Sequence, residues 1–519
     1  MPNQKSPLEP GARIVKGGFV VLATYLIMMF LNVISTIAML RLLGDEGYGT
    51  YGVGISLFSI IQGIAVLGIP TAAVRYIAKF MAKGDIASTK IVLRTSVKYL
   101  IISSAGFSIA LALLAGPIAS GIYHNVNYTN TFRVVAVMVP PGILLLGFIA
   151  FLQGFQRMKY YSYVQISWSS LRLFISIGLV LLGFFATGAL LGYGIGIAAA
   201  CALGILLLFR IVPKKRGGGC GKADIPHEMR STAVQMWLAS VGGLILVWCP
   251  NLLIGSILSM KSAGYYFASL SFITIISFFS GAISTPLFPA VSELWALGDK
   301  RGLERMVGIS LKLTFAVIFP IATVTAVFSR FILALMGGSA FIAGATVLSI
   351  LSVALIFQIL EGINDVILCG IGKPRVFAKI YWAGVLSTVM ITIPAAFLYG
   401  INGVAAGYLI TIVLITFLGT YSVKKLAKLK YSQPAFFKIV LADVVMIALL
   451  LCFRPFVTTT LHAIFVGMIG ILTYMAILLL SGFISRSDVQ MLQQISKDMG
   501  EPSVLVKITN FLKRFARQT

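Results

Sequence analysis

The chain has 519 residues, of which 59% are hydrophobic and 11% charged, and its mean hydropathy is +0.98. This composition is too apolar for a soluble globular protein and predicts an all-α integral membrane protein. The net charge of +26 does not indicate a nucleic-acid-binding protein, because the basic residues are divided among short loops instead of forming one patch.

Apolar runs of membrane-spanning length account for most of the chain. A spanning helix needs about 20 mostly apolar residues, and fourteen runs meet that requirement. The first of them is longer than the apolar part of a signal peptide, so we expect it to be retained as a span. The expected spans are 17–40, 51–74, 97–117, 132–153, 163–186, 190–211, 234–257, 265–289, 308–329, 343–368, 378–399, 402–423, 436–453 and 462–483.

The orientation follows from the Lys and Arg residues in the loops, which gather on the cytoplasmic side of a membrane protein. If the N-terminus is cytoplasmic, that side receives 36 basic residues and the other side five. One span too many or too few would reverse every later loop. The ratio therefore favours an even number of spans with both termini in the cytoplasm of a multi-pass protein of the plasma membrane.

Several landmarks recur at nearly one offset. Gly49 and Tyr51 precede Gly264 and Tyr266 by 215 residues, and GALLGY from Gly188 precedes GVAAGY at the same interval. This indicates two parallel repeats of six spans; chance similarity in glycine-rich sequence is the alternative. The expected organisation is an N-terminal lobe at 1–212, a basic, glycine-rich linker at 213–231, a C-terminal lobe at 232–430, two added spans at 431–484 and an amphipathic cytoplasmic tail at 485–519.

The sequence shows no catalytic or metal-binding constellation. The three histidines lie in separate loops, the five cysteines lack metal-ligand spacing, and the short outer loops offer few acids. Sugar chemistry needs paired acids or a sizeable surface outside the membrane. We therefore expect no enzyme, no metal and no cofactor.

Polar residues inside the fifth span are the best candidates for substrate binding. Gln165, Trp168 and Arg172 share one helical face. An aromatic ring beside a guanidinium suits a sugar next to a phosphate, because Arg binds phosphate in a planar fork. The alternative is that Arg172 extends to the cytoplasmic interface.

The tenth span carries two acids, Glu361 and Asp365, on one face. A charge at bilayer depth costs about 2.5–3.5 kcal/mol on insertion scales and normally faces a partner or a cavity. These acids can bind a proton or sodium ion, pair with Arg172, or join the two lobes. A structural role is the commoner one, and we expect it for Glu361.

Four amides lie in the spans that would line a cleft between the lobes. They are Asn32, Gln62, Gln235 and Asn251. We include them among the candidate substrate-binding residues. Helix packing is the alternative role for a single Asn or Gln in a membrane.

Three segments, in this order along the chain, carry a family resemblance: RLLGDEGYGTYG at 41–52, LGIPTAAVRYIA at 67–78 and LQGFQRMKYYS at 152–162. With the two repeats and two added spans, they resemble the polysaccharide transporter branch of the multidrug/oligosaccharidyl-lipid/polysaccharide exporter superfamily. The resemblance implies a V-shaped transporter of two six-helix lobes. It also implies a flippase that moves a polyprenyl-(pyro)phosphate-linked oligosaccharide to the outer leaflet by alternating access.

The resemblance implies membrane lipids and a lipid-linked glycan as ligands, with glycan polymerases or transferases as protein partners and no nucleic acid. The peptidoglycan-precursor flippases are more distantly similar and carry arginines in their first span, whereas residues 17–40 here contain none. A cation-coupled drug exporter of the same superfamily is the alternative transporter. A membrane enzyme or a scaffold of glycan assembly is the alternative from another class.

Overall fold

The computed structural model describes residues 8–212, 225–429 and 433–483, and within these ranges it contains helices and no strand. Ten helical stretches of the described chain are long and apolar enough to cross a membrane. The prediction of an all-α, multi-pass membrane protein is therefore confirmed. Most of the predicted linker and the whole predicted tail lie outside the described residues.

The N-terminal half of the chain forms six α-helices with short π- and 3-10 segments between them. These elements are α1 (Leu8–Ala65), α2 (Ile69–Ala82), α3 (Ile86–Pro117), η1 (Ile118–Ile122), η2 (Val126–Tyr128), α4 (Thr129–Gly154), α5 (Met158–Leu179), η3 (Val180–Phe184) and α6 (Phe185–Ile211).

The C-terminal half continues in the same way and ends in a helical hairpin. Its elements are α7 (Ile225–Ile257), α8 (Met260–Ala296), α9 (Lys300–Val327), α10 (Ser329–Gly337), η4 (Ser339–Gly344), α11 (Ala345–Gly370), α12 (Pro374–Ser387), η5 (Thr388–Thr392) and α13 (Ile393–Ala427). The hairpin consists of α14 (Gln433–Phe453), η6 (Arg454–Phe456) and α15 (Thr460–Leu480).

Glycine turns divide the longest helical stretches. At 1.5 Å per residue, the 58 residues of α1 would extend about 87 Å as a straight helix, nearly three times the hydrocarbon core of about 30 Å. The chain reverses at Gly44, whose φ of 67° lies in the left-handed region that glycine tolerates. Gly183 and Gly400 make corresponding turns at φ 89° and 58°. Each of these stretches is therefore long enough to cross a bilayer twice and has a turn at which the chain can reverse.

The predicted span at 51–74 is wrong as a single helix. The structure ends α1 at Ala65 and begins α2 at Ile69, with Leu67 and Gly68 both at positive φ between them. Pro70 at the start of α2 has no N–H to continue the earlier helix. The Ile64 carbonyl accepts a long hydrogen bond of 3.4 Å from the Leu67 N–H and a shorter one of 2.8 Å from Trp237 Nε1, so a residue of α7 stabilises this helix end.

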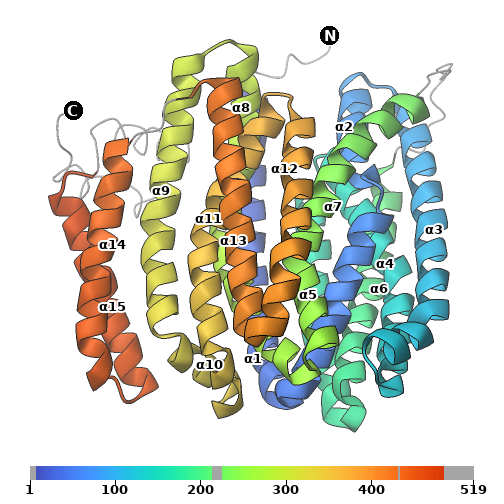
Figure 1. The fold of residues 1–519 in the computed structure, drawn as a ribbon. Coiled ribbons are helices and arrows are strands. Elements are labelled where there is room, and N and C mark those ends of the chain that lie inside the picture. Colours follow the sequence, from blue (N-terminus) through green and yellow to red (C-terminus); the bar gives the residue numbers. More distant parts are fainter. Residues whose placement is uncertain (1–7, 213–224, 430–432, 484–519) are drawn as a thin grey trace.

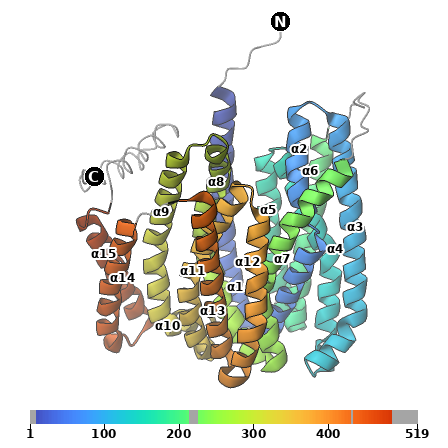
Figure 2. The same ribbon diagram turned by 45° about the horizontal axis from the view of Figure 1, so that its top comes forward.

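The two halves of the chain lie side by side. Figure 1 shows α3, α4 and α6 at one end of the molecule and α9, α11 and α13 toward the other, with α14 and α15 at the far edge. The tilted view keeps this order (Figure 2). We call the face at which α1 begins the terminal face, and the face that contains the Gly44 turn the opposite face.

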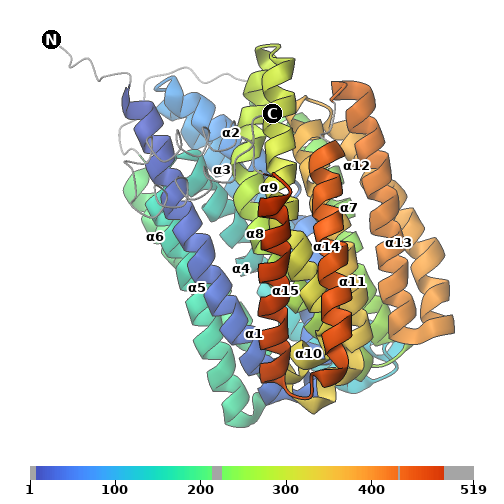
Figure 3. The same cartoon turned by 90° about the vertical axis from the view of Figure 1, so that its left-hand side faces the viewer.

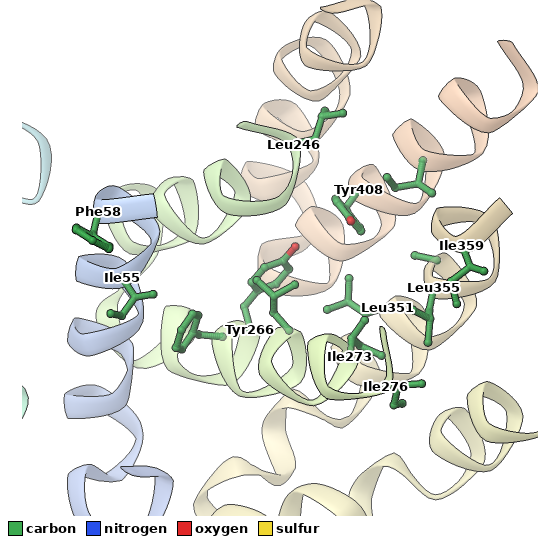
Figure 4. Packing of buried hydrophobic residues seen from close by; sticks show 14 of the residues in the cluster. Ile55, Phe58, Leu246, Tyr266, Ile273, Ile276, Leu351, Leu355, Ile359 and Tyr408 are labelled. Carbon is green, nitrogen blue, oxygen red and sulfur yellow. The ribbon is translucent and has the colours of Figure 1, made fainter. Parts of the chain in front are cut away.

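The halves meet mainly where α1 packs against α7 and α8. Figure 4 shows α1, with Ile55, beside α8, whose Tyr266 and Ile273 lie toward Leu351 of α11, while Phe58 points away from α8. Because all five residues belong to one buried cluster, one apolar core continues through both halves. Near the opposite face the backbones of α1 and α8 almost touch. A Cβ placed on Gly49 would lie 1.8 Å from the carbonyl oxygen of Met260, and only glycine permits this approach.

Candidate functional site

Small residues on α6 bring α5 close enough to point its polar face into the N-terminal half. A Cβ on Gly196 would lie 2.7 Å from the backbone nitrogen of Arg172, and a Cβ on Gly192 would lie 2.4 Å from Cα of Ser176. Glycines four residues apart form the close-packing surface typical of membrane helices. The backbone of Arg172 is therefore held against α6.

The guanidinium of Arg172 meets polar and aromatic groups from three helices. Its Nη2 donates a hydrogen bond to Asn32 Oδ1 of α1. Its central carbon lies 5.7 Å from the ring centre of Trp168 and 5.3 Å from that of Tyr193 on α6. The structure thus brings together Asn32, Trp168 and Arg172, three of the predicted binding residues.

Several polar atoms of this cluster are buried without a hydrogen-bond partner in the part of the chain that the structure describes. They are the Nε of Arg172, the Nε1 of Trp168 and the Oε1 of Gln165. Gln165 uses its amide nitrogen to donate to the Tyr161 hydroxyl at 3.3 Å. No acid of the described chain forms an ion pair with Arg172. Unpaired buried donors are costly, so these atoms suit a ligand with anionic and hydroxyl groups.

The remaining predicted amides do not join this cluster. Asn251 of α7 is fully buried and donates a 3.0 Å hydrogen bond from Nδ2 to Ser56 Oγ of α1, so it joins the two halves. Gln62 of α1 lies beside α4, where its Nε2 would be 3.0 Å from a Cβ on Gly142. Gln235 lies in α7, and its side chain is outside the described part of the structure.

A second polar cluster lies in the C-terminal half around Glu361 and Asp365 of α11. The two carboxyl groups are within hydrogen-bonding reach of each other. Asn364 Nδ2 lies 3.3 Å from Glu361 Oε2 and 3.1 Å from Thr420 Oγ1 of α13. The Tyr381 hydroxyl of α12 donates a 2.7 Å hydrogen bond to Asp365 Oδ2. Their described partners all belong to the C-terminal half, and neither acid contacts Arg172.

This acid pair is built into the interior. Glu361 is 1% exposed, and a Cβ on Gly419 would lie 2.5 Å from its Oε2, so the glycine leaves room for the carboxylate. One further oxygen of each acid, together with Asn364 Oδ1, is buried and has no partner among the described residues. These three buried acceptors face no donor of the described residues, so they are available to a bound proton or small cation.

Sequence reasoning missed some residues of both clusters. Tyr193, beside Arg172, ends the GALLGY segment, and an aromatic residue within a glycine-rich span was the available signal. Three residues surround the acid pair: Tyr381 donates to Asp365, Thr420 accepts from Asn364, and Gly419 leaves room for Glu361. These three are ordinary residues for membrane helices, and nothing in their spacing relates them to Glu361.

Known proteins resemble this chain in sequence. The sequence profile described as "Polysaccharide biosynthesis protein" matches residues 14–295, more than half of the chain. A putative O-antigen transporter of Shigella flexneri is 22% identical over 77% of this chain and 95% of that protein. A probable low-salt glycan biosynthesis flippase of Haloferax volcanii is 24% identical over 47% of this chain and 52% of that protein.

Solved structures show the same fold. A lipid II flippase, MurJ, in an inward closed conformation superposes with a TM-score of 0.69 at 14% identity, covering 89% of this chain and 98% of that one. At such low identity the likeness concerns the fold alone. Together with the sequence match, it shows that the chain belongs to the polysaccharide biosynthesis protein family, in the polysaccharide transporter branch of the multidrug/oligosaccharidyl-lipid/polysaccharide exporter superfamily.

Proposed function

We propose that this protein is a flippase that moves a polyprenyl-(pyro)phosphate-linked oligosaccharide from the cytoplasmic to the outer leaflet of the plasma membrane. The observation that carries the proposal is the Arg172 guanidinium, which has an unpartnered buried Nε and no acidic partner among the described residues. A phosphate supplies both the missing charge and the missing acceptor. The relatives named as glycan transporters and flippases support the same function.

The architecture that we propose consists of fourteen crossings, with two six-helix lobes and the α14–α15 hairpin. The terminal face is cytoplasmic, in agreement with the excess of basic residues in the loops of that side. Rocking of one lobe against the other, about the contact of α1 with α7 and α8, would expose the Arg172 cluster to each face in turn. Glycan polymerases or transferases would act on the cargo at either side.

Trp168 suits the sugar that follows the phosphate. Its ring lies beside Arg172, and its Nε1 donor has no partner among the described residues. Gln165 lies about one turn closer to the terminal face than Trp168. Its Oε1 acceptor has no partner among the described residues. In this proposal the phosphate binds deepest at Arg172, about 21 Å along α5 from its start at Met158, and the glycan extends toward the cytoplasm.

Transport in sealed vesicles tests the function. Reconstituted protein should move a fluorescent polyprenyl-pyrophosphate-linked oligosaccharide across the bilayer, whereas an enzyme should turn over a soluble acceptor in detergent. Arg172→Ala should weaken substrate binding about 10- to 150-fold, the effect of losing a hydrogen bond to a charged group. Translocation by Arg172→Ala at the wild-type rate would refute the assignment of Arg172 to the phosphate.

We propose further that Glu361 and Asp365 bind one cation, a shared proton, that couples transport to an ion gradient. Two carboxyl groups within hydrogen-bonding reach need a proton or metal ion between them. Glu361→Gln should fold normally and lose its dependence on a proton gradient. A Glu361→Gln protein that keeps full gradient dependence would return this pair to the structural role expected from the sequence.

A further inference from the structure

A pocket of about 330 Å³ lies where the α14–α15 hairpin meets the C-terminal half. Figure 3 shows α14 and α15 in front of α9 and α11, whose side chains form the opposite wall of the pocket. The volume falls at the lower end of the range for small-molecule sites, about 300–1,000 Å³. Neither the Arg172 cluster nor the acid pair contributes to it.

The pocket is apolar along its length. The small side chains of Ala322 and Ala326 on α9 make room for the pocket. Val353 of α11 and Ile447 of α14 form its other walls. Its two hydroxyl groups are already used: Thr323 Oγ1 donates to the Asp443 carboxylate at 2.9 Å, and Ser352 Oγ donates to the Leu348 carbonyl at 2.7 Å. A ligand in this part of the pocket therefore needs no polar groups.

One charged residue stands at the end of the pocket. Arg454 begins η6 at the opposite face and is exposed, and its guanidinium has no hydrogen bond or ion pair with the described residues. Along α14 the lining residues run from Ile447 to Arg454, a rise of about 10 Å at 1.5 Å per residue. This is less than half of the hydrocarbon core of about 30 Å, so the pocket lies within the leaflet at the opposite face.

We propose that this pocket binds an anionic phospholipid of the leaflet at the opposite face, which is the outer leaflet in our proposed orientation. The lipid phosphate binds the Arg454 guanidinium, and one acyl chain follows the pocket toward Thr323. Arg matches phosphate in charge and in its planar fork of donors. A zwitterionic lipid carries its own cation beside the phosphate, so an anionic headgroup fits Arg454 better.

Native mass spectrometry of the full-length protein in nanodiscs of phosphatidylglycerol and phosphatidylcholine tests the site. The wild-type protein should retain one phosphatidylglycerol in preference to phosphatidylcholine. Arg454→Ala should weaken this retention about tenfold or more, and Ala326→Phe should abolish it by filling the pocket. The matched control is Arg330→Ala, which removes another exposed arginine near the opposite face that does not line the pocket. It should retain the lipid.

Equal retention of phosphatidylglycerol by wild type and Arg454→Ala overturns the proposal, as does equal retention of the two lipids by wild type. If Ala326→Phe fails to fold, the comparison of phosphatidylglycerol retention between wild type and Arg454→Ala still tests the proposal. Displacement of phosphatidylglycerol by an equimolar polyprenyl phosphate would assign the pocket to the cargo's prenyl chain and would also overturn it. Since no transport is measured, failure of the proposed flippase activity leaves this result unaffected.

Discussion

The Asp45 carboxylate lies 3.2 Å from the Lys261 ammonium, so an ion pair connects the Gly44 turn of α1 to the start of α8. The Tyr265 hydroxyl donates a 3.1 Å hydrogen bond to the same carboxylate. Arg41 donates to the Leu335 carbonyl of α10 at 2.8 Å. These contacts hold the two halves together at the opposite face, and they must break if the protein opens to that side.

Neutralising this ion pair should favour separation of the halves at the opposite face. We expect Asp45→Asn to lengthen the distance between spin labels at Asn127 and Ser339, which are exposed residues of the two halves near that face. The neighbouring acid provides the control, because Glu46 forms no ion pair with Lys261. Identical distance distributions for Asp45→Asn, Glu46→Gln and wild type would show that the ion pair does not restrain opening.

The same contact should respond to salt more than to pH. Burial alone raises the pKa of Asp45, but hydrogen bonds from Lys261 and Tyr265 outweigh it and lower the pKa below 3.8. The hydrogen bond to Asp45 raises the pKa of Lys261 above 10.5. The stabilisation by Asp45 is therefore present above its ordinary pKa and lost only as pH falls below 3.8, and that by Lys261 is lost only as pH rises above 10.5.

Between about pH 5 and pH 9 the label distances should stay constant, because both groups keep their charges. Raising the salt from about 0.1 M to 1 M, which shortens the Debye length from about 10 Å to 3 Å, should lengthen them. A transition near neutral pH would contradict the assignment of this contact to Asp45 and Lys261.

The close approach of α1 and α8 predicts a strong effect of one methyl group. Gly49→Ala places a Cβ 1.8 Å from the Met260 carbonyl oxygen, so the helices must move apart. We expect a loss of about 1–3 kcal/mol of stability, the usual range for overpacking, seen as a lower melting temperature in detergent. Gly106→Ala in α3, where a Cβ meets no atom within 4 Å, should leave that temperature unchanged or raise it.

Substrate binding should depend on Gly196, which has no side chain to contact the cargo but holds Arg172 in position. Gly196→Ala forces a Cβ to within 2.7 Å of the Arg172 backbone nitrogen and should displace the guanidinium from Asn32 and Trp168. We expect affinity for the lipid-linked glycan, measured by fluorescence, to fall about tenfold while the protein stays folded. Gly178→Ala in α5 has open space and is the control; equal losses in both variants would count against the positioning role.

The fold class could be predicted from the sequence because a membrane helix needs about 20 mostly apolar residues, and runs of that length are unambiguous even where single residues are not. The break after Ala65 did not. Its run of apolar residues continues through Val66 and Leu67, and the helix ends there because Gly68 takes a left-handed conformation and Pro70 supplies no N–H. Trp237 stabilises the broken helix end by donating a hydrogen bond to the Ile64 carbonyl. It belongs to a helix about 170 residues later in the chain, so no local sequence pattern relates the two residues.

The candidate site was partly predictable for the same kind of reason. Gln165, Trp168 and Arg172 share a helical face, which spacing alone reveals, whereas the contact of Arg172 with Asn32 joins residues 140 positions apart. The acids Glu361 and Asp365 were visible as charges within an apolar run. Their enclosure by Tyr381 and Gly419 depends on how α12 and α13 pack, and the order of residues along α11 carries no information about it.

The hydrogen bond between Asn251 and Ser56 has a consequence for biosynthesis. Its two residues are 195 positions apart, so at about 5–20 residues per second Ser56 is made about 10–40 s before its partner. During that interval the Ser56 hydroxyl can donate to the Gly52 carbonyl, at 2.7 Å in its own helix. The early segment therefore enters the bilayer with its donor satisfied, and the Asn251 amide finds its acceptor already in place.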